Sequence, residues 1–376
     1  MTFLSIGLRP FFLGASIWSL VSMGLWMSIY IFPTGPRPSH NSPANWHAHE
    51  MIFGYGLAVI AGFLLTAVPN WTRGKTPVGK PLLGLFLLWA TARILPFAGD
   101  SISSHLIAVV DILFAFALAV AISRPILKAK QWGNLVILAQ LAILTLSNAL
   151  YYAGHVREGL YLGFYAIIAV VFIISRRILP MFISKGVGYA FQPRHHKWVD
   201  KSSLIVFLLF AFADTFDAPP LLVGILSSAL FVMHSLKLIG WYTPGIWRKP
   251  LLWVLFVAYA ITVLGFAIKP FSIALGSVMP QLATHAFAIG GIGMMTIGIM
   301  SRVSLGHTGR AVSDPPKALT LVFILMLCSA IVRVVFPLID MSHYITWVAV
   351  SQTLWMASFA VLLAIYAYIW VSPDRK

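Results

Sequence analysis

The side chains best suited to chemistry cluster in residues 46–51, Trp-His-Ala-His-Glu-Met, where a proline-rich stretch at 33–43 runs into an apolar segment. Imidazole nitrogens bind transition metals, and a neighbouring carboxylate orients such ligands. On a helix His47 and Glu50 share a face, whereas His47 and His49 point apart. The pattern therefore indicates either a metal site supported by Glu50, or a Trp-His anchor at the membrane interface with Glu50 favouring the helix N-terminus.

A second candidate is His285, which stands early in another apolar segment and precedes Gly-Gly-Ile-Gly at 290–293. Ionisable groups inside a membrane are costly and usually functional. Small residues also follow His49, at Gly54 and Gly62. Such residues let helices pack closely or admit a flat macrocycle, and both interpretations stay open. We expect His49 and His285 to lie at similar depth.

His307 ends the same apolar segment and lies roughly 30 Å from His285 if the helix is straight, at 1.5 Å per residue. The two histidines therefore cannot bind one metal unless the segment folds back. His307 is expected at the opposite face among basic residues, which predicts an anion or propionate site or contacts with lipid headgroups. The predicted basic neighbours are Arg9, Arg73, Arg176, Arg177, Arg302 and Arg310.

Charged residues also occur near the other ends of the apolar segments. Arg93 and Arg333 each stand shortly before a proline, and Asp111 lies inside a long apolar run. The arginines either pair with Asp111 or bind the propionates of a haem. Asp111 and Glu50 are the carboxylates best placed for proton transfer, and the sequence identifies no catalytic residue.

The elements that position these groups follow from composition. Of 376 residues, 60% are hydrophobic and 10% charged, against about 25% charged residues in soluble domains. Apolar segments long enough to cross about 30 Å of hydrocarbon recur from end to end without strand-like alternation. We predict one all-α transmembrane domain over 1–376, a polytopic bundle of about twelve helices. The expected spans are 12–32, 48–69, 80–97, 104–123, 133–153, 159–180, 201–218, 219–240, 251–269, 280–301, 317–337 and 344–371.

The distribution of positive charge predicts the orientation. The formal net charge is +16, which in a soluble protein would indicate nucleic-acid binding. Here the 26 Lys and Arg residues fall on one side of the twelve-helix topology, with few exceptions, so we expect no nucleic-acid partner. By the positive-inside rule both termini are cytoplasmic and the chain is a multi-pass inner-membrane protein. The exceptions are Arg37, Arg93, Arg157, Lys269 and Arg333.

Two segments, 48–97 and 284–337, resemble each other. Each has a histidine, then glycine, then Thr-Arg-Gly or Thr-Gly-Arg about 23–25 residues on, and an arginine before a final proline. Transporters are often built from such repeats. A transporter of a metal, haem or anion is therefore one alternative function, and the span after His155 is a candidate third copy.

At these residues the chain resembles the NnrS family. The resemblance implies a bacterial inner-membrane protein of about twelve helices that contains haem b and copper and is associated with denitrification and tolerance to nitric oxide. It carries the metal ligands over to His47, His49, His285 and His307, with Glu50 in support. The matching segments are Arg9–Phe12, Trp46–Met51, Phe53–Gly54, Ala61–Thr72, Arg176–Arg177, Pro180, His285–Phe287 and Arg302–Arg310.

The function expected from this combination is protection against nitric oxide, or nitrosative, stress by binding nitric oxide or nitrosylated metal species. Haem needs one or two axial imidazoles, and copper accepts imidazole readily. The main alternative is a membrane oxidoreductase that acts on nitric oxide and requires an electron donor and a proton route. In every case the chain works within a lipid bilayer.

Overall fold

The computed structural model describes residues 2–39, 42–99, 102–275 and 279–375. Within these ranges the chain forms helices and no strand, which confirms the all-α prediction. Among the described residues, eleven helices are long and apolar enough to cross a membrane. Such a sequence forms helices because each helix satisfies its own backbone hydrogen bonds in the absence of water.

The elements of the first half of the chain are α1 (Leu8–Tyr30), α2 (Pro43–His49), η2 (Glu50–Gly56), α3 (Leu57–Thr72), α4 (Lys80–Ile94), η3 (Leu95–Phe97), α5 (Ser104–Lys128), α6 (Leu135–Tyr152) and α7 (Val156–Gly186). Those of the second half are α8 (Lys197–Thr215), α9 (Pro220–Trp241), η5 (Pro244–Arg248), α10 (Pro250–Leu275), α11 (Met279–His285), η6 (Ala286–Gly293), α12 (Met294–His307), α13 (Leu319–Val334), α14 (Phe336–Ile339) and α15 (Tyr344–Val371). Short 3-10 turns at Thr2–Leu4 (η1) and Trp132–Asn134 (η4) complete the order.

The chain divides into two compact units. The first unit comprises residues 1–167, 303–310 and 359–376, and the second comprises 168–302 and 311–358. The predicted single domain and its internal repeats stay predictions.

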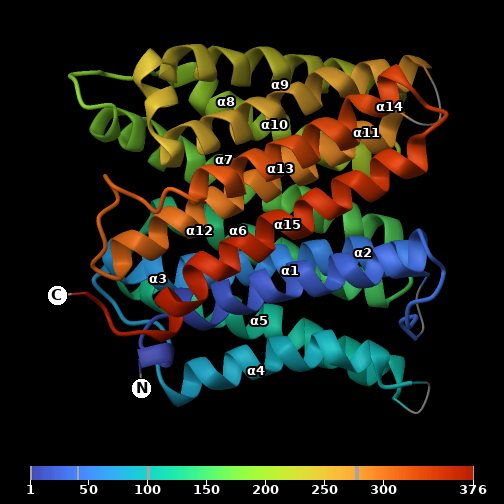
Figure 1. Cartoon of the computed structure of the whole chain (residues 1–376), viewed down its shortest axis with the longest axis horizontal. Helices are drawn as coiled ribbons and strands as arrows, with labels where there is room; N and C mark the ends of the chain where they lie inside the picture. Colours follow the sequence, from blue (N-terminus) through green and yellow to red (C-terminus); the bar gives the residue numbers. More distant parts are fainter. Residues whose placement is uncertain (1, 40–41, 100–101, 276–278, 376) are drawn as a thin grey trace. The chain divides into compact units, whose positions relative to one another are not determined.

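The first unit is built around α1, α3, α4, α5 and α6. Helix α1 packs along α3, α4 along α5, and α5 along α6 (Figure 1). Phe11 and Phe114 stack at 5.8 Å between ring centroids, and Phe11 also contacts Phe86 and Trp89 edge-on. Large buried aromatic side chains of this kind supply much of the packing that fixes helices in apolar surroundings.

Arg9 joins the start of α1 to the segment that follows α15. Its side chain is fully buried, and its guanidinium donates to the backbone oxygens of Trp370 (3.0 Å) and Ser372 (2.5 Å) and to a carboxylate oxygen of Asp374 (2.6 Å). The last carbonyls of a helix lack partners within the helix, and a cation there is favourable. Arg9 therefore caps the C-terminal end of α15.

The second unit packs α9 against both α8 and α10, and α10 against α11 and η6 (Figure 1). Helix α8 matches the expected span 201–218 but is not among the eleven helices apolar enough to cross a membrane. It carries buried carboxylates, which are neutralised by its neighbours: Asp214 lies 2.8 Å from Lys269 of α10, and Asp200 lies 3.7 Å from Lys237 of α9. Helix α8 is thus fixed to the second unit by ion pairs as well as by apolar contacts.

Two helices contain a π-helical stretch, which the sequence did not predict. The stretch η2 begins directly after His49, and η6 begins directly after His285. Both stretches contain glycine, and π-helical turns inside α-helices occur frequently at functional sites. The two histidines with the strongest sequence signal therefore stand at matching places in their helices.

Candidate functional site

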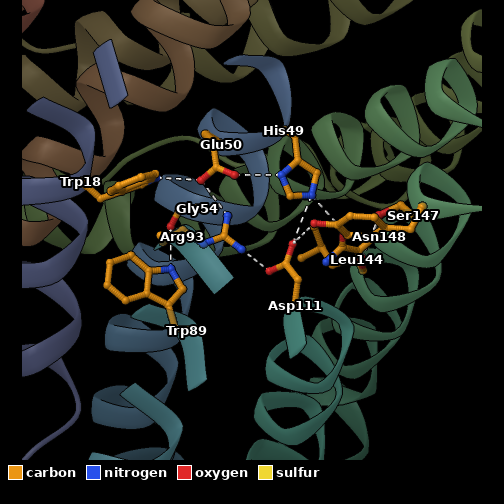
Figure 2. Close-up of polar contacts among 11 residues, drawn as sticks. Trp18, His49, Glu50, Gly54, Trp89, Arg93, Asp111, Leu144, Ser147 and Asn148 are labelled. Carbon is orange, nitrogen blue, oxygen red and sulfur yellow. Dashed lines mark hydrogen bonds and ion pairs between the residues drawn. The ribbon is translucent and has the colours of Figure 1, made fainter. Parts of the chain in front are cut away.

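A buried network of charged side chains occupies the first unit (Figure 2). It joins His49 and Glu50, at the junction of α2 and η2, to Arg93 of α4, Asp111 of α5 and Asn148 of α6. None of these side chains is more than 3% exposed. Charges so deep in an apolar bundle are costly unless they are paired, so the network is a strong candidate for function.

His49 is engaged at both ring nitrogens. Its Nδ1 lies 3.1 Å from Oε1 of Glu50, and its Nε2 lies 3.0 Å from Oδ1 of Asn148 and 3.2 Å from Oδ2 of Asp111. Oxygens of this kind only accept hydrogen bonds, whereas a neutral imidazole donates from one nitrogen alone. The geometry therefore suits the doubly protonated imidazolium.

The arginine closes the network on its other side. Arg93 donates from Nη1 to Oε2 of Glu50 at 2.7 Å and from Nη2 to Oδ1 of Asp111. Trp18 also donates to Oε2 of Glu50 at 2.8 Å, and the Tyr152 hydroxyl donates to Oδ2 of Asp111 at 3.1 Å. Of the two roles predicted for Arg93, pairing with Asp111 is the one that the structure displays.

The charges of the network balance. Imidazolium and guanidinium face two carboxylates, so the group carries no net charge although each member is buried. Removing one partner of such a set leaves an uncompensated charge, which is strongly destabilising. The same arrangement has a chemical capacity, because His49, Glu50 and Asp111 can hold or pass a proton while Arg93 fixes their positions.

Glycine at position 54 lets the π-helical segment fit under the network. A Cβ at Gly54 would lie 2.5 Å from Oε2 of Glu50 and 2.6 Å from Nε1 of Trp18. The indole N–H of Trp89 donates to the carbonyl of Gly54 at 2.9 Å (Figure 2). At this glycine, the groups that approach the backbone closely are a carboxylate and an indole.

The other predicted ligands have different surroundings. His47 stacks on Trp26 with ring centroids 4.7 Å apart, whereas His49 contacts Glu50, Asn148 and Asp111, so the two histidines point to different partners. His285 contacts the backbone oxygen of Gln281 through Nδ1 at 2.7 Å. Because a carbonyl only accepts, this Nδ1 carries a hydrogen, as it does in histidines that bind a metal through their other ring nitrogen.

His307 ends α12 without a fold-back, since α11, η6 and α12 form one helix of 27 residues from Gln281. The structure therefore keeps His285 and His307 at opposite ends of that helix. Next to His307 the first unit holds Arg310, which donates to Oγ of Ser372 at 3.3 Å. Partial burial and the positive charges of Arg375 and Arg9 lower the pKa of Arg310. This excess of positive charge is consistent with the predicted anion site, which stays a prediction.

Three arginines named from the sequence are placed as follows. Arg73 follows the last residue of α3 and adopts the left-handed backbone region at φ 54°. Arg302 places its guanidinium 3.8 Å from the ring centroid of Phe182, and Arg333 donates to the hydroxyl of Tyr344 at 2.8 Å. Their roles toward a propionate or anion stay predictions.

Sequence reasoning missed several partners. Trp18 and Tyr152 have no motif that marks them, because an indole or a phenol in an apolar helix is common. His234 of α9 is also buried, and it pairs with the Tyr259 hydroxyl through Nδ1. The sequence signal that could have identified it is a histidine in the middle of an apolar segment.

Within the described ranges, no three or more His, Cys, Asp or Glu side chains form a group that could hold a metal ion. Fold and site together define a polytopic, all-helical membrane protein with a charge-balanced network in its interior. The sequence model of the NnrS family, described as NnrS protein, matches residues 2–373, and the chain belongs to that family. A search among curated proteins finds no match. Family membership makes this a membrane protein associated with nitric oxide.

Proposed function

We propose that this chain is a haem- and copper-containing protein of the bacterial inner membrane that protects against nitric oxide stress by binding nitric oxide or nitrosylated metal species. The observation that supports it most is the state of His285. Its Nδ1 hydrogen is directed to the carbonyl of Gln281, so Nε2 is the ring nitrogen that would bind a metal. Metal-bound histidines almost always donate their other ring N–H in this way.

The residues fit haem better than they fit copper. A porphyrin supplies the equatorial nitrogens, so one or two imidazoles from the protein are enough to hold its iron. Copper takes more donors from the protein, and the described residues bring no three suitable side chains together. We therefore name His285 as a haem ligand and assign no copper ligands. Bound haem would supply an iron atom to which nitric oxide binds.

The test is optical and metal analysis of the purified protein. We expect a Soret band in the wild type, a shift of that band on titration with nitric oxide, and loss of part of the haem in His285→Ala. The matched control is His343→Ala, because that histidine is exposed and bound to Asp340 in a loop. A wild-type protein with neither haem nor copper, or with a spectrum that nitric oxide does not change, refutes the proposal.

A second candidate, an oxidoreductase acting on nitric oxide, is favoured by the buried network. Reduction of nitric oxide consumes protons, and His49, Glu50 and Asp111 are buried groups that can transfer them. Steady consumption of nitric oxide with a quinol or reduced cytochrome as electron donor, lost in Glu50→Gln, supports this candidate. Binding without turnover in the wild type refutes it.

The same proposal places both termini in the cytoplasm. This orientation follows from the positive-inside rule and requires that α8 count as one of twelve crossings. A reporter fused after Gln131, in the predicted cytoplasmic loop between α5 and α6, is expected to show a cytoplasmic signal. A periplasmic signal refutes the orientation.

A further inference from the structure

The second unit carries a surplus of positive charge where α7, α8 and α9 meet. Asp200 is the only acidic residue between positions 159 and 213, a stretch in which Lys and Arg recur. Nζ of Lys237 lies 3.7 Å from its carboxylate, and Nε of Arg176 and Nδ1 of His195 each lie 3.8 Å from it. Lys237 and Arg176 alone exceed the single negative charge. This group of four side chains, the basic cluster, therefore keeps a net positive charge.

The loop between α7 and α8 is held in place, so the basic cluster is a built site. The backbone N–H of Arg194 donates to the carbonyl of Gly240, near the end of α9, at 2.8 Å. A Cβ at Gly240 would lie 2.7 Å from the carbonyl oxygen of Arg194, so the close approach requires glycine. The hydroxyl of Ser184 donates to the carbonyl of Phe191 at 2.8 Å. These contacts fix His195, the next residue of the loop, in the basic cluster.

The basic cluster is buried on one side and open on the other. The side chains of Lys237 and Asp200 are 6% and 9% exposed. Those of Arg176 and His195 are 52% and 47% exposed. Lys237 is also held by Ser203, to whose Oγ it donates at 2.7 Å. Arg176 donates from Nη1 to the backbone oxygen of Asp200 at 3.2 Å. Because a guanidinium has several further N–H groups, its exposed side can bind an anion from outside the protein.

The lengths of the helices place the basic cluster at the level of a membrane surface. Helix α7 begins at Val156. At 1.5 Å per residue Arg176 lies roughly 30 Å further along it, which is about the thickness of the hydrocarbon core. Trp198, in the first turn of α8, has an exposed side chain. Tryptophan is enriched where a membrane meets water. The basic cluster is therefore expected at the depth of the phospholipid headgroups.

Helix α8 continues from the basic cluster with an exposed apolar face. Spacings of three and four residues put its exposed apolar side chains on one side of the helix. They are Ile205, Leu208, Leu209 and Phe212. Lys197 and Lys201 are exposed and precede this face at the same spacing. A positively charged end followed by an apolar face matches both parts of a phospholipid, its charged headgroup and its acyl chains. A free anion would match only the charged end.

We propose that the basic cluster, together with Lys201, binds the headgroup phosphate of an anionic phospholipid whose acyl chains lie along α8. The guanidinium of Arg176 matches the oxygens of a phosphate, and Lys201 adds a point charge. Behind them the buried Lys237 contributes positive charge, while Asp200 and Ser203 hold it in place. Basic pockets between transmembrane helices bind lipid headgroups in this way. The inference requires neither haem nor nitric oxide.

The experiment measures lipid binding to the purified protein by native mass spectrometry in a neutral detergent. The probes are phosphatidylglycerol, which has a net negative headgroup, and phosphatidylcholine, which has a neutral one. We expect phosphatidylglycerol to bind at least about tenfold more tightly. Arg176→Gln and Lys201→Gln should each weaken its binding by about fivefold, since each basic side chain near an anionic headgroup contributes about that much. Neither substitution should change the binding of phosphatidylcholine.

The matched control is Lys317→Gln, because Lys317 is an exposed lysine of the same unit that precedes α13. It should bind phosphatidylglycerol as the wild type does. Equal binding of the two lipids by the wild type overturns the proposal. Equal losses in Lys317→Gln and Arg176→Gln also overturn it, because positive charge anywhere on the surface would then explain the binding.

Two further measurements separate a lipid site from its alternatives. Inorganic phosphate at the same concentration should not displace phosphatidylglycerol; if it does, the ligand is a free anion and the assignment to a lipid is wrong. Because Arg176 and Lys201 are exposed, their variants should unfold at the wild-type temperature in detergent, so weaker binding reports the site. A wild type without haem refutes the proposed function and leaves all these expected results unchanged.

Discussion

Replacing Asp111 by asparagine should strip one negative charge from the buried network while keeping the shape of the side chain. His49 and Arg93 would then face Glu50 alone. Nε2 of His49 lies 3.2 Å from Oδ2 of Asp111, a separation at which two unit charges attract by about 5 kcal/mol at an effective dielectric constant of about 20. Since desolvation offsets part of this attraction, we expect Asp111→Asn to lower the free energy of unfolding by about 3–5 kcal/mol.

The decisive measurement is a double-mutant cycle with His49→Gln. Each single variant leaves a net charge in the interior, whereas the double variant leaves Arg93 and Glu50 as a neutral pair. The double variant should therefore cost at least about 1 kcal/mol less than the sum of the two single variants. Unfolding free energies measured by steric trapping in mixed micelles give all the terms.

The cycle also tests the protonation state of His49. If the ring were neutral, His49→Gln would remove no charge, and only the lost hydrogen bond would couple the two substitutions, by about 0.5 kcal/mol or less. Additivity would refute the charge-balanced network. A cycle of His49→Gln with Asp374→Asn is the control and should be additive, because Asp374 is exposed and belongs to the contact with Arg9.

Three further results follow from particular contacts. Gly54→Ala should lower the free energy of unfolding by about 1–3 kcal/mol and disturb the network, since its methyl carbon would lie 2.5 Å from a carboxylate oxygen. Gly84→Ala is the control, because nothing lies within 4 Å of the added carbon. It should be neutral or stabilising in the same unfolding assay. Arg9→Lys should cost about 1.5–3 kcal/mol and Asp374→Asn under about 1 kcal/mol; equal costs would contradict the capping role of Arg9. Hydrogen bonds from neighbouring Ser and His side chains lower the pKa of Asp340 to about 2. Its contribution to stability is therefore present above about pH 4 and is lost as pH falls toward 2. Asp340→Asn should reduce the change in the free energy of unfolding between about pH 4 and pH 2, and an unchanged pH dependence would contradict the shift.

The helices could be predicted from the sequence because a bilayer-spanning run of apolar residues has few alternatives to helix. The expected span 344–371 coincides with α15, and the break between the spans at 218 and 219 falls in the turn between α8 and α9. The pairing of Arg93 with Asp111 was one of two roles predicted for this arginine. It could be predicted because charged side chains in a membrane interior usually pair with opposite charges.

The neighbours of each side chain across the bundle could not be predicted in the same way. A helix that is apolar all round has no polar stripe to show which face meets which partner. Trp18 and Tyr152 therefore gave no sign of contacting Glu50 and Asp111. The π-helical stretch after His49 added a second obstacle, because it changes the rotation of residues relative to a regular α-helix. Glu50 was expected to share a face with His47, and the structure gives it a hydrogen bond with His49.

The capping contact of Arg9 has a consequence for the order in which the protein is made. Arg9 lies at the start of α1, so it is synthesised and enters the membrane long before α15. Its partners at 370–374 are synthesised more than three hundred residues later. Until then the guanidinium must be held by lipid headgroups, water or an insertion factor, and the first helix reaches its final surroundings only when α15 arrives. The first unit therefore cannot complete its capping contact before α15 has been translated.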